Sequence, residues 1–392
     1  MDYKNINDIL PKKLVNEIQN YIQGQYVYIP KRIENKLEWG SNTNFRREIG
    51  LRNVRIYEKH LEGESIRNIA GMFKLSEKSI RRIVKLMSKD EEGEKLRVKK
   101  LLKENWNLVG DIKPIYTNVW EIEGRYVAKK YFNTEELQRN VEILQILHNE
   151  NIPVPQIIKT TNNKMYGEMN GVKVLVTSKL EGSNIVDTGK CTAEWYFYVG
   201  EIIAKLHNAF LKCQTKIDCW YNSLLGEMKS WIYESLKASD FQLISEKQYM
   251  ETLQKLEQNY DKLSEQLIHR DVHLGNFLLC EKRFSGYLDF DLSQINIRIF
   301  DICYFLLGLL TEDSYKLDKE EWLIAVNEVT KGYCSINKLS FDEKTEIVYV
   351  MESIEILFVA WFINEGDSQQ ADESKRIYNF IRTNRNDIIA NV

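Results

Sequence analysis

The stretch LIHRDVHLGNFLLC, residues 267–280, constrains this chain of 392 residues more than any other feature. It places Asp271 five residues before Asn276, and a third polar residue, Asp289, follows in GYLDFDLS, 18 residues after Asp271. An Asp on a loop can orient an acceptor hydroxyl and take its proton, and the oxygens of Asn and Asp suit the hard ion Mg²⁺. Phosphoryl transfer needs little from a protein beyond such positioning and charge neutralisation. The spacing therefore predicts a phosphotransfer site.

The chain that precedes this stretch is rich in predicted strands. Between 113 and 132 the runs VWEIEG and RYVAKKYF predict two strands joined in a hairpin around Glu123-Gly124. Apolar residues at helical spacing predict a helix over 134–148, and VKVLVTSKL predicts a further strand at 172–180. These elements together indicate a small, β-rich lobe.

After residue 182 the pattern is mostly helical, and only two short runs, at 277–280 and 286–290, read as strands. A β-rich small lobe followed by a helical large lobe is the outline of a bilobal, protein-kinase-like α+β fold. We therefore predict a small lobe at 105–180 and a large lobe at 181–392.

These residues, about 105–392, resemble the aminoglycoside phosphotransferase and choline kinase-like family of the protein-kinase-like superfamily. The family's HGDxHxxN loop is matched by HRDVHLGN, in which Arg270 replaces the usual Gly, and its metal-binding Asp is matched within LDF. EIIAKLHNAF at 201–210 and Asp301 match two scaffold features of the family. The resemblance implies that Asp271 is the catalytic base and that Asn276 and Asp289 bind Mg²⁺.

Asp291 follows the metal-binding Asp by two residues. Two interpretations of Asp291 stay open: it contacts and positions the residues that bind the ligand, or it is a solvated carboxylate.

The resemblance also implies a phosphate-binding lysine on a strand of the small lobe. RYVAKKYF offers Lys129 and Lys130, and only one of them points toward the site because strand side chains alternate. The family pattern of two apolar residues followed by Lys favours Lys129, although the residues alone do not exclude Lys130. Glu142, on the following helix, is expected to be the acidic partner of the lysine.

A nucleotide, ATP or GTP, is the cofactor that the resemblance implies. The backbone groups of Ser178 and Leu180 are expected to hydrogen-bond the purine, and either purine would fit such contacts. The loop over the phosphates is expected near 115–119, with Asn118 as a nucleotide-binding residue. It carries no GxGxxG motif.

The acceptor is expected to be a small molecule with a hydroxyl group, such as an aminoglycoside or a choline-like alcohol. Only twelve residues separate Asp289 from Asp301, which leaves no room for the long peptide-docking segment of a protein kinase. The insert around 214–240 and the helices beyond 305 are expected to wall the acceptor pocket. Its identity does not follow from the sequence.

The head of the chain, residues 1–88, has a different character. Within 62–88, two apolar stripes flank a short turn at Leu75-Ser76, and Ser76 suits the N-cap of the second helix. This is the pattern of a helix-turn-helix. The basic residues of the second helix face away from its apolar stripe and are expected to contact duplex DNA; they are Lys78, Arg81, Arg82 and Lys85. The alternative is a helical hairpin with a solvated basic face.

Most of residues 3–88 resembles the Mor-type family of transcription activators, in the runs ILPKKLVNEIQNYIQGQYVYIPKR and LRNVRIYEKHLEGESIRNIA. The resemblance implies pairing through 8–30 into a homodimer, and a head used only for self-association remains open. Residues 1–90 carry seven more basic than acidic side chains although the whole chain has a net charge of −3, so the head is basic and the body acidic. The stretch 89–104 between them is dense in charge and reads as a linker or a solvated helix.

Two functions from different classes fit these observations. One is an active phosphotransferase fused to a DNA-binding head, and the other is a transcription regulator whose kinase-like part senses a ligand with little or no turnover. The complete set of Lys129, Asp271, Asn276 and Asp289 favours the first, because a sensor is free to lose one of them. The six cysteines form no CxxC pair and are expected to be reduced thiols, and no apolar run is long enough to span a membrane. Both features suggest the cytoplasm.

Overall fold

The computed structural model describes residues 12, 13, 15, 56, 57, 59, 60, 63–73, 75–169, 171–184, 191–280, 283–311 and 317–392, without the side chains of 86–92. The chain divides into two compact units, Met1–Leu51 and Arg52–Val392, and the second holds nearly all of the described residues. The pairing segment predicted at 8–30 lies outside the described residues, apart from 12, 13 and 15.

The two helices predicted in the head are present as α3 (Ile66–Met72) and α4 (Glu77–Trp106). Ser76 caps α4 as predicted, since its hydroxyl accepts a hydrogen bond from the N–H of Ser79. The apolar stripes meet in a small core in which Ile56, Ile69 and Ile80 are fully buried. Packing of one short helix across the start of another is the geometry that a helix-turn-helix requires.

Helix α4 runs without a break through the stretch that reads from the sequence as a linker or a solvated helix. Its last turns are neither, because Val98, Leu101 and Leu102 are buried against the sheet of the small lobe. Trp106 closes the contact, donating a hydrogen bond from Nε1 to the carbonyl oxygen of Ile158 at 2.7 Å. The spacing of these residues gives one apolar stripe among many charges, and this stripe makes the end of α4 part of the small-lobe core.

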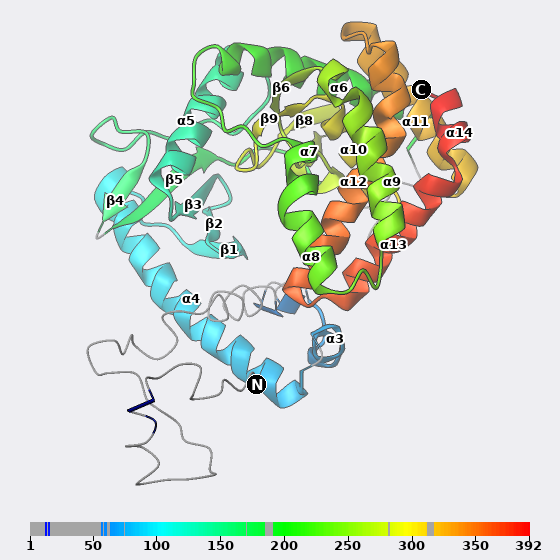
Figure 1. The fold of residues 1–392 in the computed structure, drawn as a ribbon. Helices are drawn as coiled ribbons and strands as arrows, with labels where there is room; N and C mark the ends of the chain where they lie inside the picture. The colour runs from blue at the N-terminus through cyan, green and yellow to red at the C-terminus, as the bar shows by residue number, and fades with distance from the viewer. Residues whose placement is uncertain are drawn as a thin grey trace. The chain divides into compact units, whose positions relative to one another are not determined.

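The small lobe is a five-stranded antiparallel sheet with the order β1-β2-β3-β5-β4 (Figure 1). The predicted hairpin joins β2 to β3, and its turn residues Glu123 and Gly124 both have positive φ, at 51° and 70°. The strands and the helix that follows β3 are β1 (Ile112–Tyr116), β2 (Val119–Ile122), β3 (Tyr126–Tyr131), α5 (Thr134–Asn149), β4 (Gly167–Met169) and β5 (Val172–Ser178).

The large lobe is mainly helical, as predicted, and its helices surround two short β-ladders. The helices are α6 (Ala193–Gln214), α7 (Leu224–Glu227), α8 (Tyr233–Ala238), α9 (Glu246–Asn259), α10 (Ile299–Gly308), α11 (Lys319–Ile336), α12 (Phe341–Glu365), α13 (Ser368–Thr383) and α14 (Arg385–Ala390). A π-helical turn, Met228–Ile232, joins α7 to α8.

The ladders pair β6 (Glu265–Ile268) with β9 (Gln294–Ile297), and β7 (Phe277–Cys280) with β8 (Arg283–Tyr287). The β6–β9 pair was not predicted, and the second strand-like run, 286–290, leaves the ladder after Tyr287, so that Asp289 lies in a turn. The two ladders hold the loop 269–276 and this turn between them.

One buried core extends from α5 and the end of β3 into the helices of the large lobe. All six cysteines are free thiols. No helix in the described part of the chain is long and apolar enough to cross a bilayer.

Candidate active site

Asp301, at the start of α10, holds the loop that carries the predicted base. Its carboxylate accepts hydrogen bonds from the N–H groups of His269, at 2.9 Å, and Arg270, at 2.8 Å. The same carboxylate contacts Nε2 of His207 on α6 at 3.0 Å, and Nδ1 of His207 lies 2.8 Å from the Tyr333 hydroxyl. The two scaffold features found in the sequence therefore form a single buried network.

Asp271 lies on this loop with both carboxylate oxygens engaged. Oδ1 accepts a hydrogen bond from the hydroxyl of Tyr304 at 2.8 Å, Oδ2 accepts one from Nδ2 of Asn276 at 2.9 Å, and His273 Nε2 lies 3.6 Å from Oδ2. Burial acts to raise the pKa of Asp271, but the contact with His273 and the charges of the neighbouring histidines outweigh it and bring the pKa to about 2. The carboxylate is therefore fully ionised at neutral pH.

Asn276 connects Asp271 to the turn that carries Asp289. Its side-chain amide donates to Asp271, which turns Oδ1 of the amide away from that bond; no described residue hydrogen-bonds this oxygen. Its backbone carbonyl accepts from the N–H of Leu288 at 2.9 Å, and the Leu288 carbonyl lies 3.0 Å from His269 Nε2. Asp289, the next residue, is thus tied through the backbone to the loop 269–276.

Asp289 and Asp291 share one lysine. Nζ of Lys129 lies 3.0 Å from Oδ1 of Asp289 and 2.6 Å from Oδ2 of Asp291. Burial lowers the pKa of Lys129, but the two carboxylates raise it by more, so that the net shift is upward and the ammonium stays charged. Asp289 has a side chain that is 46% exposed and keeps a face open to an incoming ligand, whereas Asp291 is only 16% exposed.

Asp291 is therefore not a solvated carboxylate, which was one of the two interpretations left open. Its Oδ1 accepts hydrogen bonds from the hydroxyl of Tyr131, at 3.0 Å, and from Nδ2 of Asn140, at 2.7 Å. Burial, opposed by Lys129 and reinforced by Asp289, raises the pKa of Asp291. Sequence reasoning missed Tyr131 and Asn140, although Asn140 interrupts the apolar stripe of α5 formed by Leu137 and Val141.

The structure separates the two lysines that the sequence left as alternatives. On β3, Lys129 shares a face with Tyr131 and points to the two carboxylates, whereas Lys130 points the other way and pairs with Glu94 of α4 at 2.7 Å. This is the alternation expected of any strand.

Glu142 is not the partner of Lys129. It is exposed on α5 and lies near Cys219, on which its charge acts. The acidic residue of α5 that senses Lys129 is Glu136, whose pKa is raised by burial first and by Asp291 second, with Lys129 opposing. Glu136 and Asn140 lie four residues apart on one face of the helix, and Glu142 lies roughly 200° around from Asn140 at 3.6 residues per turn. The prediction of Glu142 was wrong because this residue lies on a different face of α5 from Glu136 and Asn140.

The residues predicted to bind the purine and phosphates lie at the edges of the small lobe. The N–H of Ser178 is already bonded to the carbonyl oxygen of Gln156 at 2.7 Å, whereas the backbone of Leu180 makes no hydrogen bond to any described residue. Leu180 therefore suits a purine better than the N–H of Ser178 does. Asn118 lies in the turn between β1 and β2 with φ of 63°, and its carbonyl oxygen accepts from the N–H of Lys130.

The donor set fits Mg²⁺ as far as the protein supplies it. Asp289 and Asn276 offer oxygen ligands, and the described residues contain no group of three or more His, Cys, Asp or Glu that could cage a metal by themselves. Mg²⁺ is usually held by one or two carboxylates together with water and substrate phosphates. Two protein oxygens beside a phosphate site are therefore sufficient.

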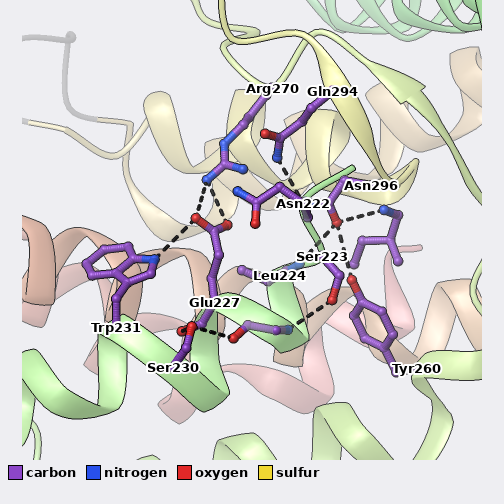
Figure 2. Close-up of polar contacts among 12 residues, drawn as sticks. Asn222, Ser223, Leu224, Glu227, Ser230, Trp231, Tyr260, Arg270, Gln294 and Asn296 are labelled. Carbon is purple, nitrogen blue, oxygen red and sulfur yellow. Dashed lines mark hydrogen bonds and ion pairs between the residues drawn. The ribbon is translucent and has the colours of Figure 1, made fainter. Parts of the chain in front are cut away.

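Arg270 is the residue that departs from the expected Gly, and it has φ of 69°, in the left-handed region. Figure 2 shows it directed at Glu227 of α7, whose two carboxylate oxygens lie 2.8 and 3.0 Å from Nη2. Trp231, on the π-helical turn, donates from Nε1 to the same carboxylate at 3.3 Å. The guanidinium also lies over the ring of Phe300, 5.5 Å from its centroid. These contacts hold the loop of the base against the insert at 214–240.

The four basic residues predicted to contact DNA are all exposed on α4, while Ile80 and Ile83 of the same helix are buried. Arg81 forms an ion pair with Glu77 at 2.8 Å, and Lys85 also has an interaction partner. The described residues of the head thus present one basic helical face.

Comparisons with known proteins agree with this division of the chain. A sequence model of the "Phosphotransferase enzyme family" matches residues 115–335, more than half of the chain. A model of the "Mor transcription activator family" matches residues 2–97. The predicted resemblances of the body and the head are both confirmed.

Curated relatives fall into the same two groups. Over 84 residues the chain is 37% identical to the "Uncharacterized protein YraL" of Bacillus subtilis (strain 168), covering 21% of this chain and 97% of that protein. Over 195 residues it is 26% identical to the homoserine kinase of Methylobacillus glycogenes, covering 46% of this chain. The chain spans only 55% of the length of that homoserine kinase.

Solved structures of low sequence identity share the fold of the two lobes. Wild-type aminoglycoside 2'-phosphotransferase-IIIa in its GDP complex is 15% identical, with a TM-score of 0.56, over 74% of this chain and 99% of that one. An amicoumacin kinase in complex with AMP-PNP and Ca²⁺ is 16% identical, with a TM-score of 0.56, over 76% of this chain and 96% of that one. The predicted protein-kinase-like fold is confirmed.

Proposed function

Because this chain belongs to the phosphotransferase enzyme family, we propose that it transfers the γ-phosphoryl group of ATP or GTP to a hydroxyl group of a small molecule. The observation that carries the proposal is the grouping of Lys129, Asp289 and Asp271 around one pair of turns tied together by the Asn276–Leu288 bond. An ammonium ion, a metal-binding carboxylate and a hydroxyl-orienting carboxylate are the parts that phosphoryl transfer requires.

Asp271 orients the acceptor in this proposal. With a pKa of about 2 it is a weak base, so it acts mainly by accepting a hydrogen bond from the hydroxyl and takes the proton late, as bonding to phosphorus develops. The hydroxyl of Tyr304 and the amide of Asn276 hold the carboxylate in place, one on each oxygen. The acceptor hydroxyl is then presented from a carboxylate that has lost its rotational freedom.

Lys129 binds the phosphates of the nucleotide. Its ammonium lies between two carboxylates, which keep it charged and extended toward the turn at 289–291. Asp291 is fixed by Tyr131 and Asn140, so it serves as the permanent anchor of the lysine. Asp289 and Asn276 would hold Mg²⁺, which supplies charge neutralisation across the phosphates when it is bound.

The purine and the acceptor are the finer parts of the proposal. The related fold binds GDP in one solved structure and AMP-PNP in another, and the backbone of Leu180, which no described residue hydrogen-bonds, suits either purine. Homoserine kinases among the relatives, and an aminoglycoside phosphotransferase among the structures, support a small acceptor that carries an amino group and a hydroxyl group. An acidic body suits such a cation.

The experiment is a turnover assay of the full-length chain with ATP and with GTP. The acceptor panel contains aminoglycosides, choline-like alcohols and homoserine. Asp271→Asn keeps the size of the side chain and removes its charge, so turnover should fall by about a hundredfold or more while nucleotide affinity changes little. Unchanged turnover in this variant would refute the role proposed for Asp271. An absence of transfer to every acceptor, while the nucleotide binds normally, would refute the enzyme and favour a ligand sensor.

A second function, DNA binding by the head, is favoured by the match to a transcription activator family and by the basic face of α4. Binding through phosphate contacts weakens linearly on a logarithmic salt scale. Full-length protein should therefore bind duplex DNA with a salt slope that becomes shallower in the variant Lys78→Ala, Arg82→Ala. A head that only self-associates would show no salt-dependent DNA binding.

A further inference from the structure

A pocket lies on the small lobe, and none of the residues proposed for phosphotransfer lines it. It is a pocket of about 590 Å³ between the last turns of α4 and the edge of the sheet, within the size range of small-molecule sites. Ile122 on β2 and Leu102 on α4 form its floor, and both belong to the core that joins helix and sheet. This is the α4 side of the sheet, to which Lys130 points, whereas Lys129 and the carboxylates lie on the other side.

The wall of this α4 pocket is apolar. Leu96, Leu108, Val109 and Met169 complete it around the floor. Leu96 is 71% exposed and Val109 is 74% exposed, so two large apolar side chains that line the pocket stand in water. Covering them is favourable, because each Å² of apolar surface removed from water contributes roughly 25 cal/mol. A ligand with an apolar body would cover these two side chains.

The rim of the pocket is cationic. Arg97, Lys99, Lys100 and Lys103 line it, and no Asp or Glu does. Three of these four have carboxylates nearby, at 2.8 Å for Arg97, 3.6 Å for Lys99 and 3.9 Å for Lys100, but the pairs are exposed and therefore weak. Lys103 forms no ion pair with any residue that the structure describes. The rim thus keeps a net positive charge beside an apolar wall.

We propose that the α4 pocket binds an amphipathic anion, a molecule with an apolar body and a single carboxylate or phosphate head, with the head at Lys103 and the body between Leu96 and Val109. A neutral apolar molecule would leave the cationic rim unused, and a nucleic acid backbone would leave the apolar wall uncovered. A polar anion alone would gain nothing from the two exposed side chains. Only the combination of both parts matches the pocket.

The test is isothermal titration calorimetry of the full-length chain with decanoate and with decyl phosphate, both below their micellar concentrations. Decanol and decyltrimethylammonium share the apolar body and lack the negative charge. We expect saturable binding of at least one anion at one site per chain, about tenfold or more tighter than either control, as one charge-assisted contact provides. Preference between the two anions identifies the head group.

Matched variants locate the binding on the protein. Lys103→Glu should weaken anion binding by about tenfold or more, because it reverses the charge at the proposed head-group position. Leu96→Asp should also weaken binding, because it replaces an apolar side chain of the pocket wall with a carboxylate. Lys216→Glu makes the same charge change at an exposed lysine of the large lobe and should leave binding unchanged. The proposal is overturned if neither anion saturates, if decanol binds equally well, or if Lys216→Glu weakens binding as much as Lys103→Glu. The readout does not involve phosphotransfer, so the result for this pocket is independent of whether the proposed enzyme activity is found.

Discussion

The ion pair between Glu227 and Arg270 offers a sharp test of how the loop of the predicted base is held. Glu227 has a side chain that is 9% exposed and Arg270 one that is 14% exposed, so both charges are largely out of water. Nη1 of Arg270 is buried and has no hydrogen-bond partner among the described residues, which leaves Glu227 as the main compensation for the guanidinium. Removing the charge of Glu227 therefore leaves the buried guanidinium of Arg270 without a neutralising partner.

Glu227→Gln should therefore lower the free energy of unfolding by about 3 kcal/mol, at the lower end of the cost of breaking a buried pair, because the amide oxygen keeps one acceptor. Arg270→Gly alone should also destabilise the protein, since it leaves the buried carboxylate of Glu227 without its cationic partner. The double variant should recover most of the loss: it contains no buried charge at this place, and Gly adopts the φ of 69° without strain. The expected coupling energy is about 2 kcal/mol in a double-mutant cycle.

Urea denaturation of the four proteins measures the cycle. Glu328→Gln removes one partner of an exposed pair with Lys331, 2.8 Å apart on α11, and should cost about 0.5 kcal/mol or less. A coupling energy no larger than the cost of Glu328→Gln would show that the ion pair between Glu227 and Arg270 in Figure 2 does not stabilise the loop. Turnover of Glu227→Gln should fall through kcat more than through KM, because the pair contacts the loop of the base and not the nucleotide.

Three further outcomes follow from the same geometry. Lys129→Met should weaken nucleotide binding by about tenfold or more, whereas Lys130→Met, its neighbour on the opposite face, should change affinity little, as measured by equilibrium titration. Burial raises the pKa of Glu355 to about 8, above its unfolded value, so stability should fall as pH rises from about 4.5 to 8; Glu355→Gln should flatten this dependence in urea midpoints. Leu102→Ala should cost about 2–5 kcal/mol if the end of α4 is small-lobe core, and far less if it is a solvated linker.

The order of polar residues along the chain was sufficient to predict that Asp271, Asn276 and Asp289 lie on neighbouring turns. Asp271, Asn276 and Asp289 come from two adjacent turns, so their grouping is encoded by short spacing that survives any detail of packing. Alternation on a strand predicted that only one of Lys129 and Lys130 faces the site, and the family resemblance, not the alternation, favoured Lys129. Local geometry of this kind needs no knowledge of distant contacts.

The errors concern features that depend on the phase of a helix or on distant partners. Glu142 was expected to be the partner of Lys129, whereas the face of α5 toward the site is defined by Glu136 and Asn140, which the packing of the helix selects. Strands β6 and β9 pair across 26 or more residues and each is only four residues long, so neither has a pattern of its own. The stripe of Val98 and Leu102 was hidden by the charges around it.

Strand β3 explains how one chain accommodates two chemically different halves. Its alternation sends Lys129 toward Asp289 and Asp291 and sends Lys130 toward Glu94 on α4, the helix whose first turns carry the basic face of the head. A shift of one residue in the pairing of β3 with β5 would exchange the two lysines and destroy both contacts at once. The hydrogen-bond register that directs Lys129 to the two carboxylates is therefore the same register that directs Lys130 to α4.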